Sequence, residues 1–148
     1  MKMEYNVQIL RGWPMDGALE RQEVIKSGVT LVNGDWVQMQ SDGTIDKVNA
    51  TKTANAGLVI RGNGDAASAA GTSGSGYVSG GSGKALVLWG NFIAQQKTAT
   101  TFTRGQALTA QSGALVAGTV GTDPIIGYVL DIAASGVNQD QTFSYKIN

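Results

Sequence analysis

The stretch Lys84–Trp89 (KALVLW) is an unbroken apolar run between two glycines, Gly83 and Gly90. An apolar run of this length is typical of a β-strand that is covered on both faces. A second stretch, residues 142–147 (TFSYKI), alternates polar with apolar residues, which is the pattern of a strand with one buried face. These two stretches predict an all-β protein.

Shorter stretches of the same kind extend this prediction along the chain. Asn33-Gly34 accepts the positive φ angles of a tight turn, so residues 29–32 and 35–40 are predicted to form a hairpin. Residues 18–27 are ambiguous, because they fit either a short helix or an extended stretch at 23–26. Other strands are predicted at residues 5–9, 44–48, 56–61, 92–94, 107–110, 114–117 and 125–132.

Two parts of the sequence share a layout of short strands that begin after glycines. Fourteen residues separate Gly43 from Gly57, and fourteen separate Gly113 from Gly127. The preceding glycines, Gly28 and Gly105, stand at unequal distances, so a chance match in a glycine-rich chain is the alternative. If the repeat is real, two related half-units form one small antiparallel β-barrel or sandwich, without a long exposed edge.

One long segment differs from the rest in composition. Residues 62–82 consist almost wholly of Gly, Ala, Ser, Thr and Asn around Tyr77-Val78. Such a segment buries too little apolar surface to offset the entropy lost on ordering. We therefore predict a long, flexible Gly/Ser/Ala-rich loop at 62–83.

Composition excludes several classes of function. The 148 residues include 21 glycines, and only 15% are charged, against about 25% in average globular chains. Eleven basic and eleven acidic residues give zero net charge, so there is no basic field to bind nucleic acid. The chain has no Cys or His, which excludes disulfides, a thiol nucleophile and the usual zinc, haem or iron–sulfur sites. A charge-poor, neutral chain favours assembly over a freely soluble monomer.

Neither a targeting segment nor a membrane span is expected. The first residues lack the apolar run of a secretory signal. The sequence also lacks a stretch of about 18 apolar residues, the length that a membrane-spanning helix needs.

Motifs that carry chemistry are incomplete in this sequence. Residues 62–67 fit the G-x-G-x-x-A spacing of a dinucleotide site, but the glycine-rich chain that follows cannot form the required helix. Residues 80–84 lack two positions of a P-loop. Asp42 and Asp46 fit acid–base work or calcium binding less well than a solvated turn. We therefore predict no enzyme, catalytic residue, cofactor, metal or small-molecule substrate.

Candidate contact residues are apolar or aromatic and lie outside the predicted core. Trp36 and Trp89 occur in apolar strands and are assigned to the core, although tryptophans can also stack on sugar rings. The candidates for partner contact are the alternating residues of the first strand, a Trp-Pro pair in a loop and one loop tyrosine: Tyr5, Val7, Ile9, Trp13, Pro14 and Tyr77.

The motif G-x-x-L-x-x-G-D-W-V at residues 28–37, followed by Asp42-Gly43, resembles the small cement (decoration) proteins of tailed-bacteriophage capsids. Residues 84–89, 105–108, 112–113 and 126–130 are similar to the same group. The resemblance spans residues 17–147 and implies a compact β domain, often a homotrimer, on the outer capsid surface. An extended N-terminal arm is common in that group, which predicts an arm at 1–15 and a single β domain at 16–148. The family has no catalytic motif, so no residue roles carry over.

We therefore expect a structural virion protein, made in the host cytoplasm, that cements neighbouring subunits of the major capsid protein. The expected partners are the major capsid protein and copies of this chain, and neither nucleic acid nor membrane. The alternative is another phage structural or adhesive β module, such as a fibre, tail or glycan-binding component. Fibres usually show longer repeats, and a glycan binder would expose more loop aromatics than Trp13 and Tyr77.

Overall fold

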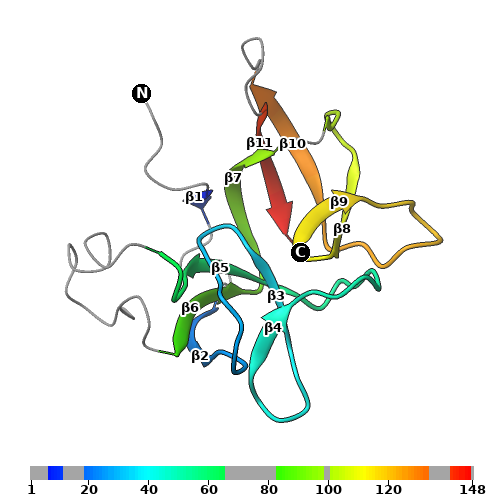
Figure 1. The fold of residues 1–148 in the computed structure, drawn as a ribbon. Coiled ribbons are helices and arrows are strands. Elements are labelled where there is room, and N and C mark those ends of the chain that lie inside the picture. Colours follow the sequence, from blue (N-terminus) through cyan, green and yellow to red (C-terminus); the bar gives the residue numbers. More distant parts are fainter. Residues whose placement is uncertain (1–6, 12–18, 66–82, 99–100, 134–140, 148) are drawn as a thin grey trace.

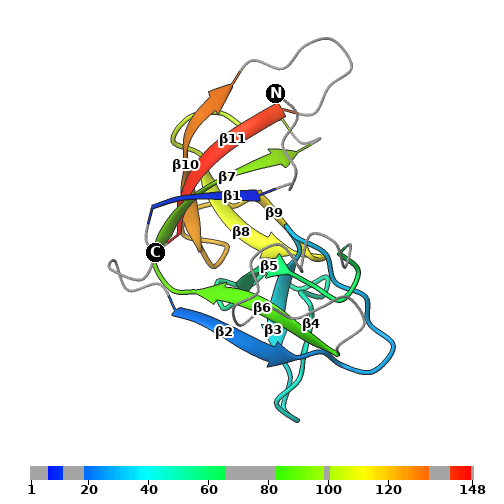
Figure 2. The same ribbon diagram turned by 90° about the vertical axis from the view of Figure 1, so that its left-hand side faces the viewer.

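The computed structural model describes residues 7–11, 19–65, 83–98, 101–133 and 141–147 (Figure 1). Within these ranges the protein is all β, and its eleven strands form two antiparallel sheets. The sheets are stacked one above the other in Figure 2. The fold is thus a sandwich-like one rather than a closed barrel, which decides between the two architectures predicted from the sequence.

One sheet has five strands and the other has six. The five-stranded sheet has the order β2-β6-β5-β3-β4, and the six-stranded sheet has the order β1-β7-β11-β10-β8-β9. The strands of the first are β2 (Leu19–Val24), β3 (Trp36–Met39), β4 (Ile45–Lys47), β5 (Gly57–Arg61) and β6 (Lys84–Trp89). Those of the second are β1 (Val7–Arg11), β7 (Phe92–Thr98), β8 (Ala107–Gln111), β9 (Ala114–Ala117), β10 (Gly127–Ala133) and β11 (Gln141–Ile147).

The two sheets repeat a single topology. Without β1, the second sheet has the order β7-β11-β10-β8-β9. This is the order of the first sheet with five added to each strand number, so that β7 corresponds to β2 and β8 to β3. We call the described residues of 19–89 the N-unit and those of 92–147 the C-unit. The two related half-units predicted from the glycine spacing are therefore present, one in each sheet.

A β-bulge at the same place in both units supports this correspondence. The pairing of β5 with β6 shifts register between Val59 and Arg61. The pairing of β10 with β11 shifts register between Val129 and Asp131. Each strand begins at the glycine of the predicted repeat, so both bulges lie equally far from the strand start. A bulge at matching positions is a specific structural feature rather than an irregularity.

The turn that leads into β3 matches the turn that leads into β8. The amide of Gly34 donates to the carbonyl of Val59 at 2.9 Å, and the amide of Gly105 donates to that of Val129 at 2.8 Å. Both glycines have positive φ angles, of 100° and 79°, which residues with a side chain rarely adopt. Gly105 therefore corresponds to Gly34, and its predicted match with Gly28 is wrong.

One prediction near this turn needs correction, and the ambiguity at residues 18–27 is resolved. Residues 29–32 form no strand, so the predicted hairpin is wrong, and β3 instead pairs with β4 and β5. The backbone of residues 29–33 bonds to side chains of residues 63–65 and is therefore not available for pairing with β3. Residues 19–24 form a strand rather than a helix, because all six of them pair with β6.

The strands on which the fold prediction rested are confirmed. β6 covers Lys84–Trp89, and its four central residues are buried, as a strand covered on both faces requires. β11 covers Gln141–Ile147 and buries the predicted alternate residues Phe143, Tyr145 and Ile147.

The core consists of two clusters of buried side chains. The smaller cluster belongs to the N-unit alone: Ile25, Leu31, Val37, Ile45, Val59, Ala85 and Val87. The larger cluster combines both units: Trp36, Val48, Ala56, Leu58, Leu88, Phe92, Ala94, Phe102, Leu108, Ala110, Leu115, Ile126, Val129, Phe143, Tyr145 and Ile147. The second cluster is therefore what holds the two sheets together.

Trp36 lies at the centre of the contact between the units. Its ring stacks on Phe92 with centroids 6.3 Å apart and lies 6.1 Å from the ring of Tyr145. Its Nε1 donates to Oε1 of Gln96 at 3.5 Å, and the Tyr145 hydroxyl donates to the same oxygen at 3.0 Å. Nε2 of Gln96 in turn donates to the carbonyl of Gly34 at 3.1 Å. Burial raises the pKa of Tyr145 well above its usual value, which keeps its hydroxyl a donor.

Removal of the indole should weaken the whole domain. We expect Trp36→Ala to lower the free energy of unfolding by about 3–5 kcal/mol, because the cavity opens where the two units meet. Val24→Ala is the control, since Val24 is half exposed and its truncation should cost less than about 0.5 kcal/mol. Urea unfolding followed by far-UV circular dichroism measures both values. Equal losses in the two variants would contradict this role for Trp36.

Candidate functional site

The predicted contact residues fall into two groups in the structure. Val7 and Ile9 lie in β1, whereas Tyr5, Trp13, Pro14 and Tyr77 lie outside the described residues. β1 pairs antiparallel with β7, and Val7 is opposite Gln96 while Ile9 is opposite Ala94. Residues 7–11 of the predicted arm are therefore the edge strand of the six-stranded sheet.

β1 lies outside the repeated topology. It pairs with β7, and in the part of the chain that the structure describes no strand pairs in the same way with the corresponding strand β2. The N-unit therefore shows that five strands suffice for one sheet of this fold. Addition of a strand to a sheet edge is one recurring way in which an extended segment binds a β protein, and here the added strand comes from the same chain.

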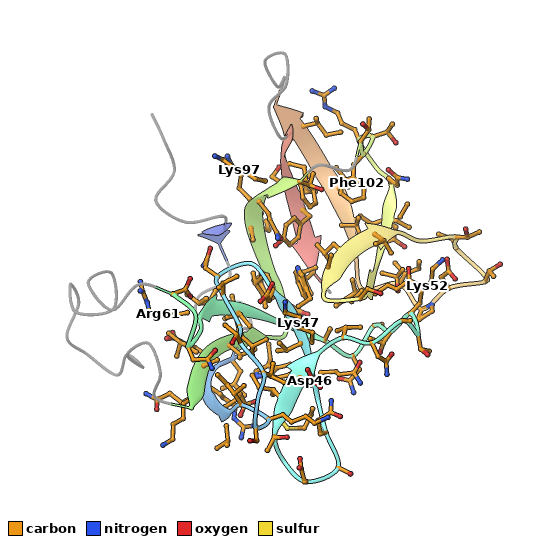
Figure 3. The ribbon with its side chains drawn as sticks, viewed as in Figure 1. Asp46, Lys47, Lys52, Arg61, Lys97 and Phe102 are labelled. Carbon is orange, nitrogen blue, oxygen red and sulfur yellow. The ribbon has the colours of Figure 1, made fainter. Side chains whose placement is uncertain are left out.

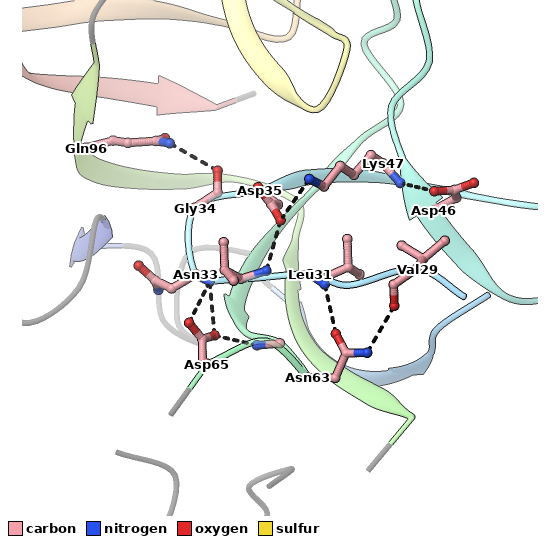
Figure 4. Close-up of polar contacts among 12 residues, drawn as sticks. Val29, Leu31, Asn33, Gly34, Asp35, Asp46, Lys47, Asn63, Asp65 and Gln96 are labelled. Carbon is pink, nitrogen blue, oxygen red and sulfur yellow. Dashed lines mark hydrogen bonds and ion pairs between the residues drawn. The ribbon is translucent and has the colours of Figure 1, made fainter. Parts of the chain in front are cut away.

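Asn63 and Asp65 bind the segment that was predicted to form a hairpin strand (Figure 4). Oδ1 of Asn63 accepts from the amide of Leu31 at 2.8 Å, and Nδ2 of Asn63 donates to the carbonyl of Val29 at 3.0 Å. Both carboxylate oxygens of Asp65 accept from the amide of Asn33, at 3.2 and 3.0 Å. The G-x-G spelling thus belongs to a turn that stabilises the fold. Residues 62–65 of the predicted loop form this turn, and residues 66–82 lie outside the described ranges.

Asp35 adds a polar contact beside that turn. Its Oδ2 accepts from the amide of Val32 at 2.9 Å and lies 3.8 Å from Nζ of Lys47. Burial is the largest effect on this carboxyl and raises its pKa, against the opposing effects of the Val32 amide and Lys47. These contacts join Asp35 to the turn at Val32 and to β4 at Lys47, so the arrangement supports the turn.

A shallow hollow lies between β3 and the loop that follows β4. Its volume is about 340 Å³, and it is lined by Gln38, Met39, Asn49, Thr51, Lys52, Thr53 and Asn55. Nζ of Lys52 is 2.9 Å from Oδ2 of Asp123 in the C-unit. The hollow offers amide and hydroxyl groups for hydrogen bonds, but its lining includes neither a carboxylate nor an aromatic ring. It can bind a polar ligand, and it has no acid–base pair for catalysis.

Three of the basic side chains are widely separated. Lys52, Arg61 and Lys97 lie far apart on different parts of the molecule (Figure 3). Among the described residues, no three acidic side chains come together in a group that could hold a metal ion. In the same ranges, no helix has the length and apolar character that crossing a membrane requires.

Large apolar side chains are exposed on the surface in several places. In the part of the chain that the structure describes, seven of them are at least about one-third exposed: Leu19, Val24, Val32, Met39, Val120, Tyr128 and Leu130. The prediction from sequence missed all of these as contact residues. They can be recognised only when the two units are compared, because that comparison shows that an exposed residue of one unit can correspond to a buried residue of the other.

In comparisons with known proteins, no family model matches this chain and no curated protein matches it.

We expect the bond between Asn63 and the 29–31 segment to contribute measurably to stability. Asn63→Ala leaves the buried amide of Leu31 without its acceptor, which should cost about 1–3 kcal/mol of unfolding free energy. Asn55→Ala is the matched control, because Asn55 is exposed and lies in another loop. Thermal unfolding at equal concentration compares the two, and a control that loses as much as Asn63→Ala would refute the assignment.

The contact between Lys52 and Asp123 predicts a dependence on pH. The amide of Thr119 and then Lys52 hold the pKa of Asp123 below its ordinary value of 3.8. The stability gained from the carboxylate is thus complete above the ordinary value and is lost as the pH falls through the lowered pKa. Asp123→Asn should therefore be less stable than the wild type at neutral pH, and the difference should shrink as the pH falls from about 5 to about 2. Urea unfolding at each pH measures it, and a constant difference would contradict the prediction.

Proposed function

We propose that this protein is a structural virion protein that binds the outer surface of a phage capsid and cements neighbouring major capsid subunits. We propose further that three copies of the chain associate as a homotrimer. The observation that carries the capsid proposal is the edge strand β1, which lies outside the repeated five-stranded unit and is joined to the N-terminal segment. The resemblance of the G-x-x-L-x-x-G-D-W-V motif to cement proteins supports the same conclusion.

The surface chemistry suits attachment by many weak contacts. The chain carries zero net charge, so copies that sit side by side on a shell repel one another little. Exposed apolar side chains on several strands provide area that neighbours can bury. In a symmetric array, such contacts gain strength through avidity, even when each is weak.

A glycan-binding module is the second candidate, and the polar hollow beside β3 favours it. Its asparagine, glutamine and threonine groups can bond to sugar hydroxyls. Its lining residues include no aromatic side chain on which a sugar ring could stack, and this makes it the weaker of the two proposals.

The direct test adds purified protein to mature capsids that lack it. We expect stoichiometric co-sedimentation with the capsids and a higher temperature of capsid disruption. Failure to bind capsids, combined with retention on a glycan array, would overturn the cement proposal in favour of the second candidate.

Deletion of residues 1–10 isolates the contribution of the N-terminal segment. We expect the shortened protein to keep its far-UV circular dichroism spectrum, because the N-unit sheet has no such strand among its described residues. Capsid attachment should become weaker. Asn55→Ala, in the polar hollow, is the control and should sediment with capsids as the wild type does. Unfolding of the deletion variant would show instead that β1 is indispensable to the core, and full attachment would remove it from the capsid contact.

A further inference from the structure

The interface between the two units joins two different faces of the repeated sheet. Trp36, Leu58 and Leu88 are paired neighbours across β3, β5 and β6, and all three are buried. They form what we call the outer face of the N-unit. This outer face belongs to the same core cluster as Phe92, Ala110 and Ile147 of the C-unit, which form its inner face. The contact is therefore of the head-to-tail kind, with unlike surfaces facing each other.

A loop of the N-unit extends this interface. The amide of Thr53 donates to the carbonyl of Ala110 at 3.0 Å, and the amide of Ala110 donates back to Thr53 at 3.1 Å. The amide of Ser112 donates to the carbonyl of Asn49 at 2.7 Å, and Nε2 of Gln111 donates to that of Ala50 at 2.8 Å. Residues 49–53 thus lie along β8, beyond the point where β10 stops pairing with it.

Because both units have the same topology, each has an outer and an inner face. The strand registers make Ala107, Tyr128 and Lys146 the outer face of the C-unit, in the places of Trp36, Leu58 and Leu88. They likewise make Leu19, Trp89 and Met39 the inner face of the N-unit, in the places of Phe92, Ile147 and Ala110. Parts of both faces are already covered within the chain, because Val37, Val59 and Val87 are buried in the smaller core cluster and the side chains of Thr109 and Gln111 bond to the 49–53 loop. The remaining parts, at Leu19 and Met39 on one face and at Tyr128 on the other, are exposed.

The exposed parts of these two faces carry most of the large apolar side chains that are exposed among the described residues. Leu19 is 53% exposed and Met39 is 43% exposed, on the inner face of the N-unit. Tyr128 is 40% exposed on the outer face of the C-unit, and Leu130 beside it is 45% exposed. Leu130 is the bulge residue of β10, and the corresponding bulge residue of β5 is Ile60. Ile60 packs against the larger core cluster, whereas Leu130 is exposed. The exposed Val120 lies in the C-unit loop that corresponds to residues 49–53.

We propose that a second copy of this chain covers these faces, so that the outer face of the C-unit of one copy docks on the inner face of the N-unit of the next. The contact joins the same two kinds of face as the interface between the units within a chain, over the parts of those faces that remain exposed. Repeated units commonly leave end faces that must be capped or joined to a neighbour. A head-to-tail contact closes into a ring if its rotation allows and otherwise extends as a filament.

The proposed contact between chains should be weaker than the contact between the units of one chain, because the side chains at corresponding positions differ. Ala107 replaces the indole of Trp36, and Lys146 replaces Leu88 on the outer face. On the inner face, the buried Glu23 has the register position of Gln96, which binds the outer face of the N-unit. Glu23 is buried and its Oε1 lies 3.5 Å from a guanidinium nitrogen of Arg21, so it does not replace the contact that Gln96 makes with Gly34. The contact should therefore form and dissolve with protein concentration.

The test uses the purified full chain without capsids, so its failure is distinguishable from failure of the capsid proposal. Met39→Asp blocks the inner face of the N-unit, and Leu130→Asp blocks the outer face of the C-unit. Val24→Asp is the control, because Val24 is equally exposed and lies outside both faces. Far-UV circular dichroism checks folding, and Leu19→Asp or Tyr128→Lys replaces a variant that does not fold. Sedimentation velocity from micromolar to millimolar concentration gives the masses.

We expect the wild type and Val24→Asp to self-associate, and each blocked variant to remain a monomer. In an equimolar mixture of the two blocked variants, Met39→Asp keeps its outer C-unit face and Leu130→Asp keeps its inner N-unit face. These two faces can dock once, so the mixture should form 1:1 dimers and nothing larger. A monomeric wild type at every concentration would overturn the proposal. So would blocked variants that associate as the wild type does, or a mixture that yields no dimer, because an interface between like faces cannot be restored by mixing.

Discussion

The contact of the Trp36 indole with the open inner face of the C-unit is the interaction on which the rest of the structure depends. Trp36 stacks on Phe92, and Gln96 connects the indole to the hydroxyl of Tyr145. Leu58, its neighbour in the pairing of β3 and β5, is buried in the same core cluster. Each sheet alone would leave one apolar face in water, which a small sheet cannot sustain. The stacking of one sheet on the other removes that cost and sets the order of the two units.

The sequence predicts where the strands lie better than it predicts which strands pair with each other. The apolar run at β6 and the alternation at β11 are local signals, so both strands are confirmed by the structure. The pairing of residues 29–32 depends instead on distant side chains, those of Asn63 and Asp65, and no local pattern reveals it. The equal glycine spacings predicted the repeat because both glycines begin a strand that carries a bulge. Exposed contact residues such as Leu130 could not be recognised before the two units were placed in register.

The surfaces explain why a structural role suits this molecule. The polar groups of the described residues are used mainly to bind turns to one another, as in the contacts of Asp35 and Asn63. Most of the large apolar side chains that remain exposed lie on two faces that differ in composition. A protein built to pack among neighbours needs such faces together with an edge strand, and β1 provides the strand. We therefore propose that attachment to a capsid and contact between copies use different parts of one scaffold.

Cysteine cross-linking measures the stacked arrangement most directly, because the chain has no cysteine of its own. Tyr128→Cys places a thiol on the outer face of the C-unit, and Leu19→Cys places one on the inner face of the N-unit. A short bis-maleimide should link a mixture of these two variants into a covalent dimer much faster than it links Tyr128→Cys with Val24→Cys. Equal rates in the two mixtures would contradict the claim that the repeat continues from one copy to the next.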